Sequence, residues 1–250
     1  MASSRKVDPF LRDVTLLRDR VASFDVYPFC IPGVRSLDRI EFHPEITFFV
    51  GENATGKSTL LEGIAVTEGF NAEGGSRNFN FSTRATHSSL GEYLRLGKGL
   101  RSLKDSDGFF LRAESFYNVA TQVEDLGPGL LRSYGGKSLH QLSHGESFFA
   151  LLCDRFWGNG LYLLDEPESA LSPSRQLSML AVMRRLIGEG SQFLIATHSP
   201  ILMAYPGAWI YQFSQQGIRR VEYTETEHYK VTKSFLERRE QMLDELFRAD

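Results

Sequence analysis

The sequence has 250 residues, of which 42% are apolar, so the chain is long enough for one large domain with its own core and too apolar for wholesale disorder. Basic and acidic residues nearly balance, at 28 against 31, and this bulk charge favours neither a nucleic-acid nor a membrane partner. The two cysteines, Cys30 and Cys153, have apolar neighbours, which is typical of buried free thiols in a reducing cytosol rather than of disulfides.

Membrane segments are not expected. No apolar run approaches the roughly 18–20 residues that a membrane helix needs. The N-terminal residues Met-Ala-Ser-Ser-Arg-Lys are followed by no apolar stretch of the kind found in signal peptides. We therefore expect a cytoplasmic protein without membrane insertion, for which any membrane role would need a partner chain.

Short apolar runs alternate with helical patterns along the chain, which indicates an α/β domain over residues 1–250 with a mainly parallel sheet. The predicted strands are Val26–Ile31, Asp38–Phe42, Ile46–Val50, Gly108–Glu114, Leu161–Leu164 and Gln192–Ala196, before a hairpin around Gln215-Gln216-Gly217. The predicted helices begin at Lys57, at Glu146 (to Phe156) and at Pro173 (to about Ile187), and a C-terminal amphipathic helix covers about 231–247.

An insert rich in Gly, Ser and Asn is expected at about 69–108. Within it, the stretch Gly74 to Lys104 has one acid, Glu92, among basic and aromatic residues: Arg77, Phe79, Phe81, Arg84, His87, Tyr93, Arg95, Lys98, Arg101 and Lys104. Such a mixture suits phosphate contacts and base stacking, so nucleic acid is one candidate partner. A flap near the nucleotide and a contact with a partner protein are the other interpretations.

A phosphate-binding loop follows the strand Ile46–Val50. The residues after this strand match the pattern G-x-x-x-x-G-K-[ST], in which backbone N–H groups and a helix N-terminus hold phosphates. Lys57 would reach the β- and γ-phosphates, and Ser58 would ligate Mg²⁺. The residues predicted to bind ATP here are Gly51, Glu52, Asn53, Ala54, Thr55, Gly56, Lys57, Ser58 and Thr59.

Two carboxylates end the apolar strand Leu161–Leu164. Asp165 at the end of a buried strand can hold Mg²⁺, as in a Walker B element, and Glu166 can act as the general base that polarises the attacking water. Alone, a strand followed by Asp-Glu-Pro would be an ordinary turn. Together with the phosphate loop it predicts nucleotide hydrolysis.

Ser143 and Glu146 have the spacing of a capping box at the start of the helix that follows. Taken alone, this pattern would indicate only a well-capped core helix. With the other motifs, Leu142-Ser143-His144-Gly145-Glu146 resembles the signature of ABC-type ATPases, although His144 replaces the first Gly of that signature.

Two further elements strengthen the resemblance to ABC-type ATPases. Ser169-Ala170-Leu171-Ser172 is similar to the D-loop, and His198 is similar to the switch histidine that contacts the γ-phosphate, which makes it a catalytic candidate beside Lys57 and Glu166. The resemblance implies a P-loop NTPase fold with an added antiparallel β lobe and a small helical segment that carries the signature. It also implies a head-to-tail dimer in which Ser143, Gly145 and Glu146 of one chain bind the ATP held by the other.

The family resemblance leaves two site positions open. ABC-type ATPases have a Gln between phosphate loop and signature that ligates Mg²⁺; here Glu114 occupies the expected position, and Gln122 lies further on. The adenine could stack on one of three aromatic residues that could equally belong to the core: Phe24, Tyr27 and Phe29.

The segment Ser115 to Gln141 is short for the membrane-gripping subdomain of a transporter ATPase, and the chain has no long coiled coil. The layout looks closest to small stand-alone bacterial ATPases of the SMC-like branch, which carry the general label of AAA family ATPases and have tails similar to Thr226-Glu227-His228-Tyr229. The implied function is ATP hydrolysis in an ATP-dependent homodimer that drives or gates a partner. The alternatives are an ATP-gated binding module for nucleic acid or an effector or toxin protein, and the energising subunit of a transporter.

Overall fold

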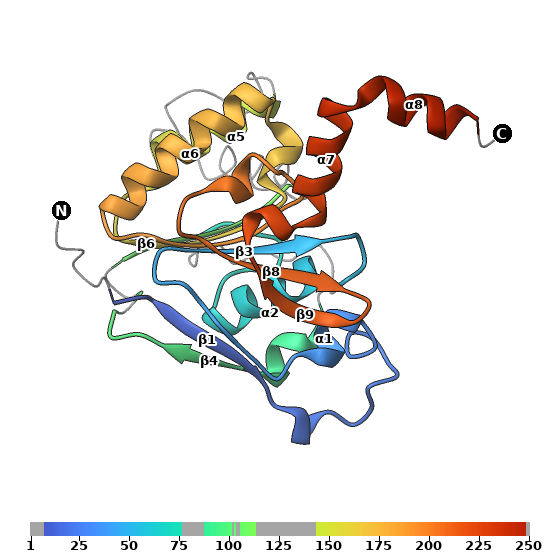
Figure 1. Cartoon of the computed structure of the whole chain (residues 1–250). Coiled ribbons are helices and arrows are strands. Elements are labelled where there is room, and N and C mark those ends of the chain that lie inside the picture. Colours follow the sequence, from blue (N-terminus) through green and yellow to red (C-terminus); the bar gives the residue numbers. More distant parts are fainter. Residues whose placement is uncertain (1–7, 77–87, 102, 104–105, 114–143, 249–250) are drawn as a thin grey trace.

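The computed structural model describes residues 8–76, 88–101, 103, 106–113 and 144–248, and its centre is a six-stranded sheet (Figure 1). In spatial order its strands are β5 (Asp107–Arg112), β6 (Gly160–Asp165), β7 (Gln192–Ala196), β3 (Ile46–Gly51), β8 (Trp209–Ser214) and β9 (Gly217–Val221). All neighbours are parallel except β8 and β9, which form the predicted hairpin. The mainly parallel α/β sheet predicted from the sequence is therefore confirmed.

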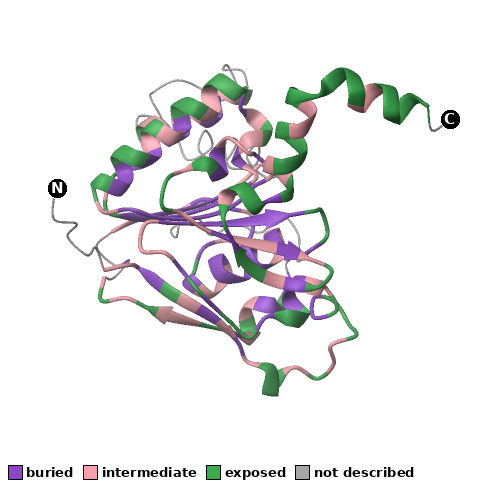
Figure 2. Ribbon diagram, in the orientation of Figure 1, coloured by how far each residue is buried: buried purple, intermediate pink, exposed green. Residues whose placement is uncertain are grey.

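Both faces of this sheet are covered, and the side chains of its central strands alternate between two cores. In β3, Ile46 and Phe48 belong to the core under α5 (His144–Ala150) and α6 (Pro173–Gly188), whereas Phe49 belongs to the core that contains α2 (Lys57–Glu68). Figure 2 shows the buried sheet between these layers. Complete burial explains why the strand sequences read as continuous apolar runs rather than as alternating patterns.

A smaller antiparallel sheet lies beside α2 and has the order β2 (Arg39–Glu41), β1 (Leu11–Leu16) and β4 (Leu94–Lys98). It is the antiparallel lobe implied by the family resemblance. Strand β1 was not predicted. It is tied to the main sheet by Gln192, which is completely buried: Oε1 accepts from the backbone N–H groups of Phe10 (3.0 Å) and Leu11 (2.9 Å), and Nε2 donates to the carbonyls of Leu11 (2.8 Å) and His43 (3.0 Å).

Replacing Gln192 should destabilise the fold more than a typical substitution does. Gln192→Leu leaves buried backbone N–H and C=O groups without partners, at about 1–3 kcal/mol for each group that water cannot reach. We expect the free energy of unfolding to fall by about 3 kcal/mol or more, as measured by urea denaturation. Gln216→Leu, at an exposed turn position, is the matched control. If the two substitutions had equally small effects on the free energy of unfolding, Gln192 would not be what holds β1 to the main sheet.

The prediction of a strand at Val26–Ile31 was wrong. The chain makes turns there, with hydrogen bonds from Cys30 N to Val26 O (3.0 Å) and from Ile31 N to Pro28 O (3.2 Å), and then enters α1 (Pro32–Ser36). Pro28 explains the difference, because proline cannot donate to a strand ladder. Cys30 is a free thiol, as expected, but it is exposed rather than buried.

The expected insert at 69–108 contributes to the fold wherever the structure describes it. Its strand β4 pairs with β1, and Lys98 Nζ lies 3.0 Å from Glu68 Oε1. Arg101 lies over the Phe10 ring, at 4.2 Å from its centroid, and donates to the carbonyl of Gly190. The basic positions Arg77, Arg84 and Lys104 lie outside the described residues.

The C-terminal helix expected at about 231–247 is instead two helices, α7 (Glu227–Glu237) and α8 (Arg239–Phe247), which meet where Arg238 leaves the helical conformation (φ −131°). Neither helix has a buried residue, and Leu236, Leu246 and Phe247 are exposed. The two helices project from the rest of the molecule (Figures 1 and 2). Across the described residues, no helix combines the length and apolarity that crossing a bilayer requires.

Candidate functional site

Three predicted motifs meet at one edge of the main sheet because they follow neighbouring parallel strands. Strand β3 leads into the phosphate loop, β6 ends at Asp165, and β7, which lies between them, leads to Thr197 and His198. The carboxyl ends of parallel strands are where open α/β sheets bind ligands. These motifs, which are far apart in the sequence, therefore lie together in one site.

The phosphate loop has a backbone that only glycine adopts easily at two points. Gly51 has φ +140°, and a Cβ atom there would lie 2.1 Å from the carbonyl oxygen of Phe213; Gly56 has φ +105° and caps the N-terminus of α2. Gly33 of α1 also contacts the loop, because its N–H donates to the carbonyl of Thr55 at 3.0 Å. The loop is therefore held on both sides, with the N-terminus of α2 facing the site.

Lys57 is buried inside this loop, where its Nζ donates to the carbonyls of Gly51 and Glu52 at 2.8 Å each. Burial lowers the pKa of Lys57, and the carboxylates of Glu166 and Asp165 oppose that shift. The ammonium group can exchange the two carbonyls for phosphate oxygens, which are stronger acceptors because they are charged.

Ser58 and Asp165 form the part of the site that suits a magnesium ion. Ser58 Oγ donates to Asp165 Oδ1 at 2.8 Å, although 107 residues separate them in the sequence. Hydroxyl and carboxylate oxygens are the ligands that Mg²⁺ prefers, usually together with substrate phosphates. Arg112, at the end of β5, was not predicted: its Nε lies 3.8 Å from Asp165 Oδ2, and its Nη1 lies 2.7 Å from Glu62 Oε2.

Glu166, which directly follows β6, has an unusual backbone conformation. Its φ and ψ are both 51°, in the left-handed region, while its backbone N–H donates to the carbonyl of Ala196 at 2.9 Å. The side chain is 41% exposed, and its Oε1 lies 3.6 Å from His198 Nε2. This geometry leaves a carboxylate open to solvent beside the phosphate loop, as a general base requires.

Glu168 fixes the backbone that carries His198, and sequence analysis missed it. Its carboxylate accepts from His198 N at 2.6 Å and from Thr197 Oγ1 at 2.8 Å. Burial raises the pKa of Glu168, whereas these hydrogen bonds lower it. A glutamate at the start of a short 3₁₀ turn, η7 (Pro167–Ala170), carries no sequence signal for this role.

His198 also meets a second histidine, His228, near the start of α7. The two nitrogens His198 Nδ1 and His228 Nε2 are 3.1 Å apart. Burial, with a smaller contribution from the Lys57 charge, lowers the pKa of His198 to about 4, and the same two causes lower the pKa of His228. Both rings are therefore neutral at pH 7.

The signature-like segment begins α5, which starts at His144. A Cβ atom on Gly145 would lie 2.5 Å from the carbonyl oxygen of Ala170, so glycine allows this helix to contact the D-loop-like turn η7 closely. Glu146 Oε1 lies 3.6 Å from Arg175 Nη2. Two further predicted site residues, Ser143 and Glu114, lie outside the described residues.

Comparisons with known proteins found matches to ATPase families and to an ATP-binding protein. Residues 28–106 match a family model described as an AAA domain, and residues 133–204 match one described as "AAA domain, putative AbiEii toxin, Type IV TA system". The hemin import ATP-binding protein HmuV of Rhodopseudomonas palustris is 26% identical over 202 aligned positions, which cover 70% of this chain and 72% of that protein. The chain is therefore similar to ATPases of the AAA-domain and ABC types.

Two solved structures are among those found to be similar to this chain. The SMC head domain from Thermotoga maritima is 19% identical, with a TM-score of 0.42 over 74% of this chain and 93% of that one. A nucleotide-free ATP-binding cassette from an ABC transporter is 17% identical, with a TM-score of 0.46 over 80% of this chain and 89% of that one.

The three residues that could stack on an adenine differ in the exposure of their side chains. Phe29 is buried and makes an edge contact with Tyr93, at 4.8 Å between ring centroids, which places it in the core. The Arg18 guanidinium covers the Phe24 ring at 4.4 Å. Tyr27 is exposed, so among the three it has the side chain most open to a ligand.

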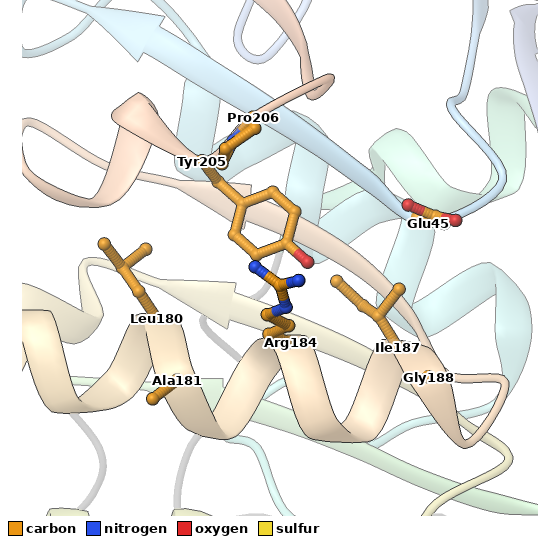
Figure 3. A pocket seen from close by; sticks show the side chains of 8 residues that line it. All are labelled: Glu45, Leu180, Ala181, Arg184, Ile187, Gly188, Tyr205 and Pro206. Atoms are coloured by element: carbon orange, nitrogen blue, oxygen red, sulfur yellow. The ribbon is translucent and has the colours of Figure 1, made fainter. Parts of the chain in front are cut away.

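A separate pocket of about 510 Å³ lies at the opposite end of β3 from the phosphate loop. Figure 3 shows the side chains that line it, which come from α6, from the residues after η8 (Leu202–Ala204) and from the residue before β3: Leu180, Ala181, Arg184, Ile187, Gly188, Tyr205, Pro206 and Glu45. Because Glu45 precedes β3 whereas the phosphate loop follows it, this pocket is distinct from the nucleotide site.

Proposed function

We propose that this ATPase hydrolyses ATP in a head-to-tail homodimer that encloses two nucleotides. The observation that carries the proposal is the convergence of the phosphate loop, the Ser58–Asp165 pair, Glu166 and His198 at one edge of the sheet. Residues Gly51 to Thr59 would hold the phosphates of ATP. Ser143, Gly145 and Glu146 of the second chain would complete each site.

Each site residue has a chemical task in this proposal. Lys57 and the N-terminus of α2 balance the phosphate charge, and Glu166 accepts a proton from the attacking water. Ser58 and Asp165 would hold Mg²⁺, with Glu114 as a further candidate ligand. When bound, the ion neutralises charge on the β- and γ-phosphates. His198 would donate from Nε2 to the γ-phosphate.

A first test compares the wild type with Lys57→Met, which keeps most of the unbranched side chain and removes its charged end. We expect the substitution to weaken ATP binding by about 10–100-fold, because a hydrogen bond to a charged group contributes about 1.5–3 kcal/mol. Calorimetry with ATP and Mg²⁺ measures the affinity, and phosphate release measures turnover. Lys230→Met, at an exposed position of α7, is the control.

The mass of the wild type in solution completes this test. On addition of ATP and Mg²⁺ it should rise from one chain to two, or a preformed dimer should become resistant to dilution. A wild type that binds ATP yet releases no phosphate and shows no change in association would overturn the proposal.

An effector function is a second candidate, because residues 133–204 match a family model whose description names a toxin of a toxin–antitoxin system. Nucleic acid has less support as a partner, since Lys98 and Arg101 of the basic insert already contact other residues of this chain, Glu68 and Phe10. Growth of bacteria that express the wild type or Lys57→Met tests the effector function. Growth arrest by the wild type alone would favour it, and equal growth would count against it.

A further inference from the structure

The His198–His228 contact joins the nucleotide site to the C-terminal helices. The two rings meet at 61°, with 5.3 Å between their centroids. The start of α7 is well anchored, because Thr226 is buried, its Oγ1 donates to the carbonyl of Tyr223 at 2.7 Å, and the same atom accepts from Tyr229 N at 3.3 Å. His228 is therefore held in place independently of His198.

One proton lies between the two facing nitrogens. A neutral imidazole carries a single N–H, so either His228 Nε2–H donates to His198 Nδ1 or the reverse. In the first arrangement the proton of His198 is on Nε2; in the second, Nε2 of His198 is a bare acceptor. These two tautomers of His198 differ in what they can do for a phosphate.

The surroundings of His198 Nε2 favour the first arrangement. This atom is buried, it has no hydrogen-bond partner among the described residues, and it lies 3.6 Å from Glu166 Oε1. A bare nitrogen there would face the lone pairs of a carboxylate, whereas an N–H would be attracted to it. The other charged groups near the pair are Lys57, Glu52 and Glu227, which act on His228, and Glu168, which accepts from His198 N.

We infer that His228 is a positioning residue that orients the His198 ring and keeps the His198 proton on Nε2, the tautomer that donates to the terminal phosphate of ATP. The inference deepens the proposed function and rests on it. Without this hydrogen bond the ring can rotate and exchange tautomers, and the bare nitrogen repels the phosphate oxygens. The nucleotide site of this ATPase thus includes a residue from α7, thirty positions after His198.

Turnover of three variants tests the role of His228. His228→Leu removes the donor and should lower kcat by about tenfold, equivalent to about 1.4 kcal/mol, with a much smaller effect on KM for ATP. His228→Gln places an amide N–H near the position of Nε2 and should restore most of the lost turnover. Thr232→Leu, exposed on the same helix, controls for a leucine on α7. A His228→Leu protein with the kcat of the wild type would overturn the inference.

The tautomer itself can be observed without ATP. Long-range ¹H–¹⁵N spectra of the imidazole rings in the full-length protein identify which nitrogen of His198 carries the proton. We expect Nε2 in the wild type and His228→Gln, and a mixture in His228→Leu. A wild-type proton on Nδ1 would overturn the inference even if every variant were active. If the wild type hydrolyses no ATP, the proposed function fails, while these spectra still decide the hydrogen bond.

Discussion

Glu166→Gln should lower ATP turnover by about 10²–10⁴-fold, the usual contribution of a general base, and leave ATP binding intact. The amide has the shape of the carboxylate but cannot accept the proton of the attacking water. The left-handed backbone at residue 166 is retained, because Glu and Gln share the same steric limits there. The variant should therefore hold ATP in the closed dimer without hydrolysing it.

Phosphate release and mass in solution measure the two halves of this prediction. With ATP and Mg²⁺, the Glu166→Gln protein should be dimeric for as long as ATP is present, whereas the wild type should return to its starting state as ATP is consumed. Glu240→Gln, exposed on α8, is a matched change of charge away from the site. Unchanged turnover in Glu166→Gln would show that another group accepts the proton.

The sequence predicted the main sheet well because burial on both faces makes its strands unusually apolar. All six residues of β3 and of β6 are buried, and this pattern is hard to mistake when turn residues surround it. The sharp turn of the loop after β3 was also predictable, because Gly51 and Gly56, which give it its backbone conformation, lie close together in the sequence. Features that are built from residues close together in the sequence can be recognised from the sequence.

Contacts between distant segments left no such signal. Gln192 reads as an ordinary polar residue until Phe10 and Leu11 are seen to donate to it across more than 180 positions. His228 was visible only as part of a family-like tail, and nothing in its neighbours indicated His198 as its partner. The prediction of a strand at Val26–Ile31 was wrong although it rested on a local signal. The β-rich composition of this segment was given more weight than its one proline, which cannot donate to a strand ladder.

Mixing two inactive variants tests whether each site is shared between chains, as a head-to-tail dimer requires. Lys57→Met damages the phosphate loop, and Ser143→Glu places a negative charge where the second chain would meet the γ-phosphate. Either variant alone should lose nearly all turnover, because both sites of its homodimer carry the same defect. A mixed dimer instead has one site with both defects and one site with none.

An equimolar mixture should therefore recover up to about a quarter of wild-type turnover, since about half of the dimers are mixed and each has one intact site of two. If the signature acted on the ATP of its own chain, every site in the mixture would keep one defect, and turnover would equal the average of the two variants. Recovery is thus expected only when Lys57 and Ser143 of one site come from different chains. A mixture of Lys57→Met with Glu166→Gln is the control, because both residues would act from the same chain and no site in their mixed dimer is intact.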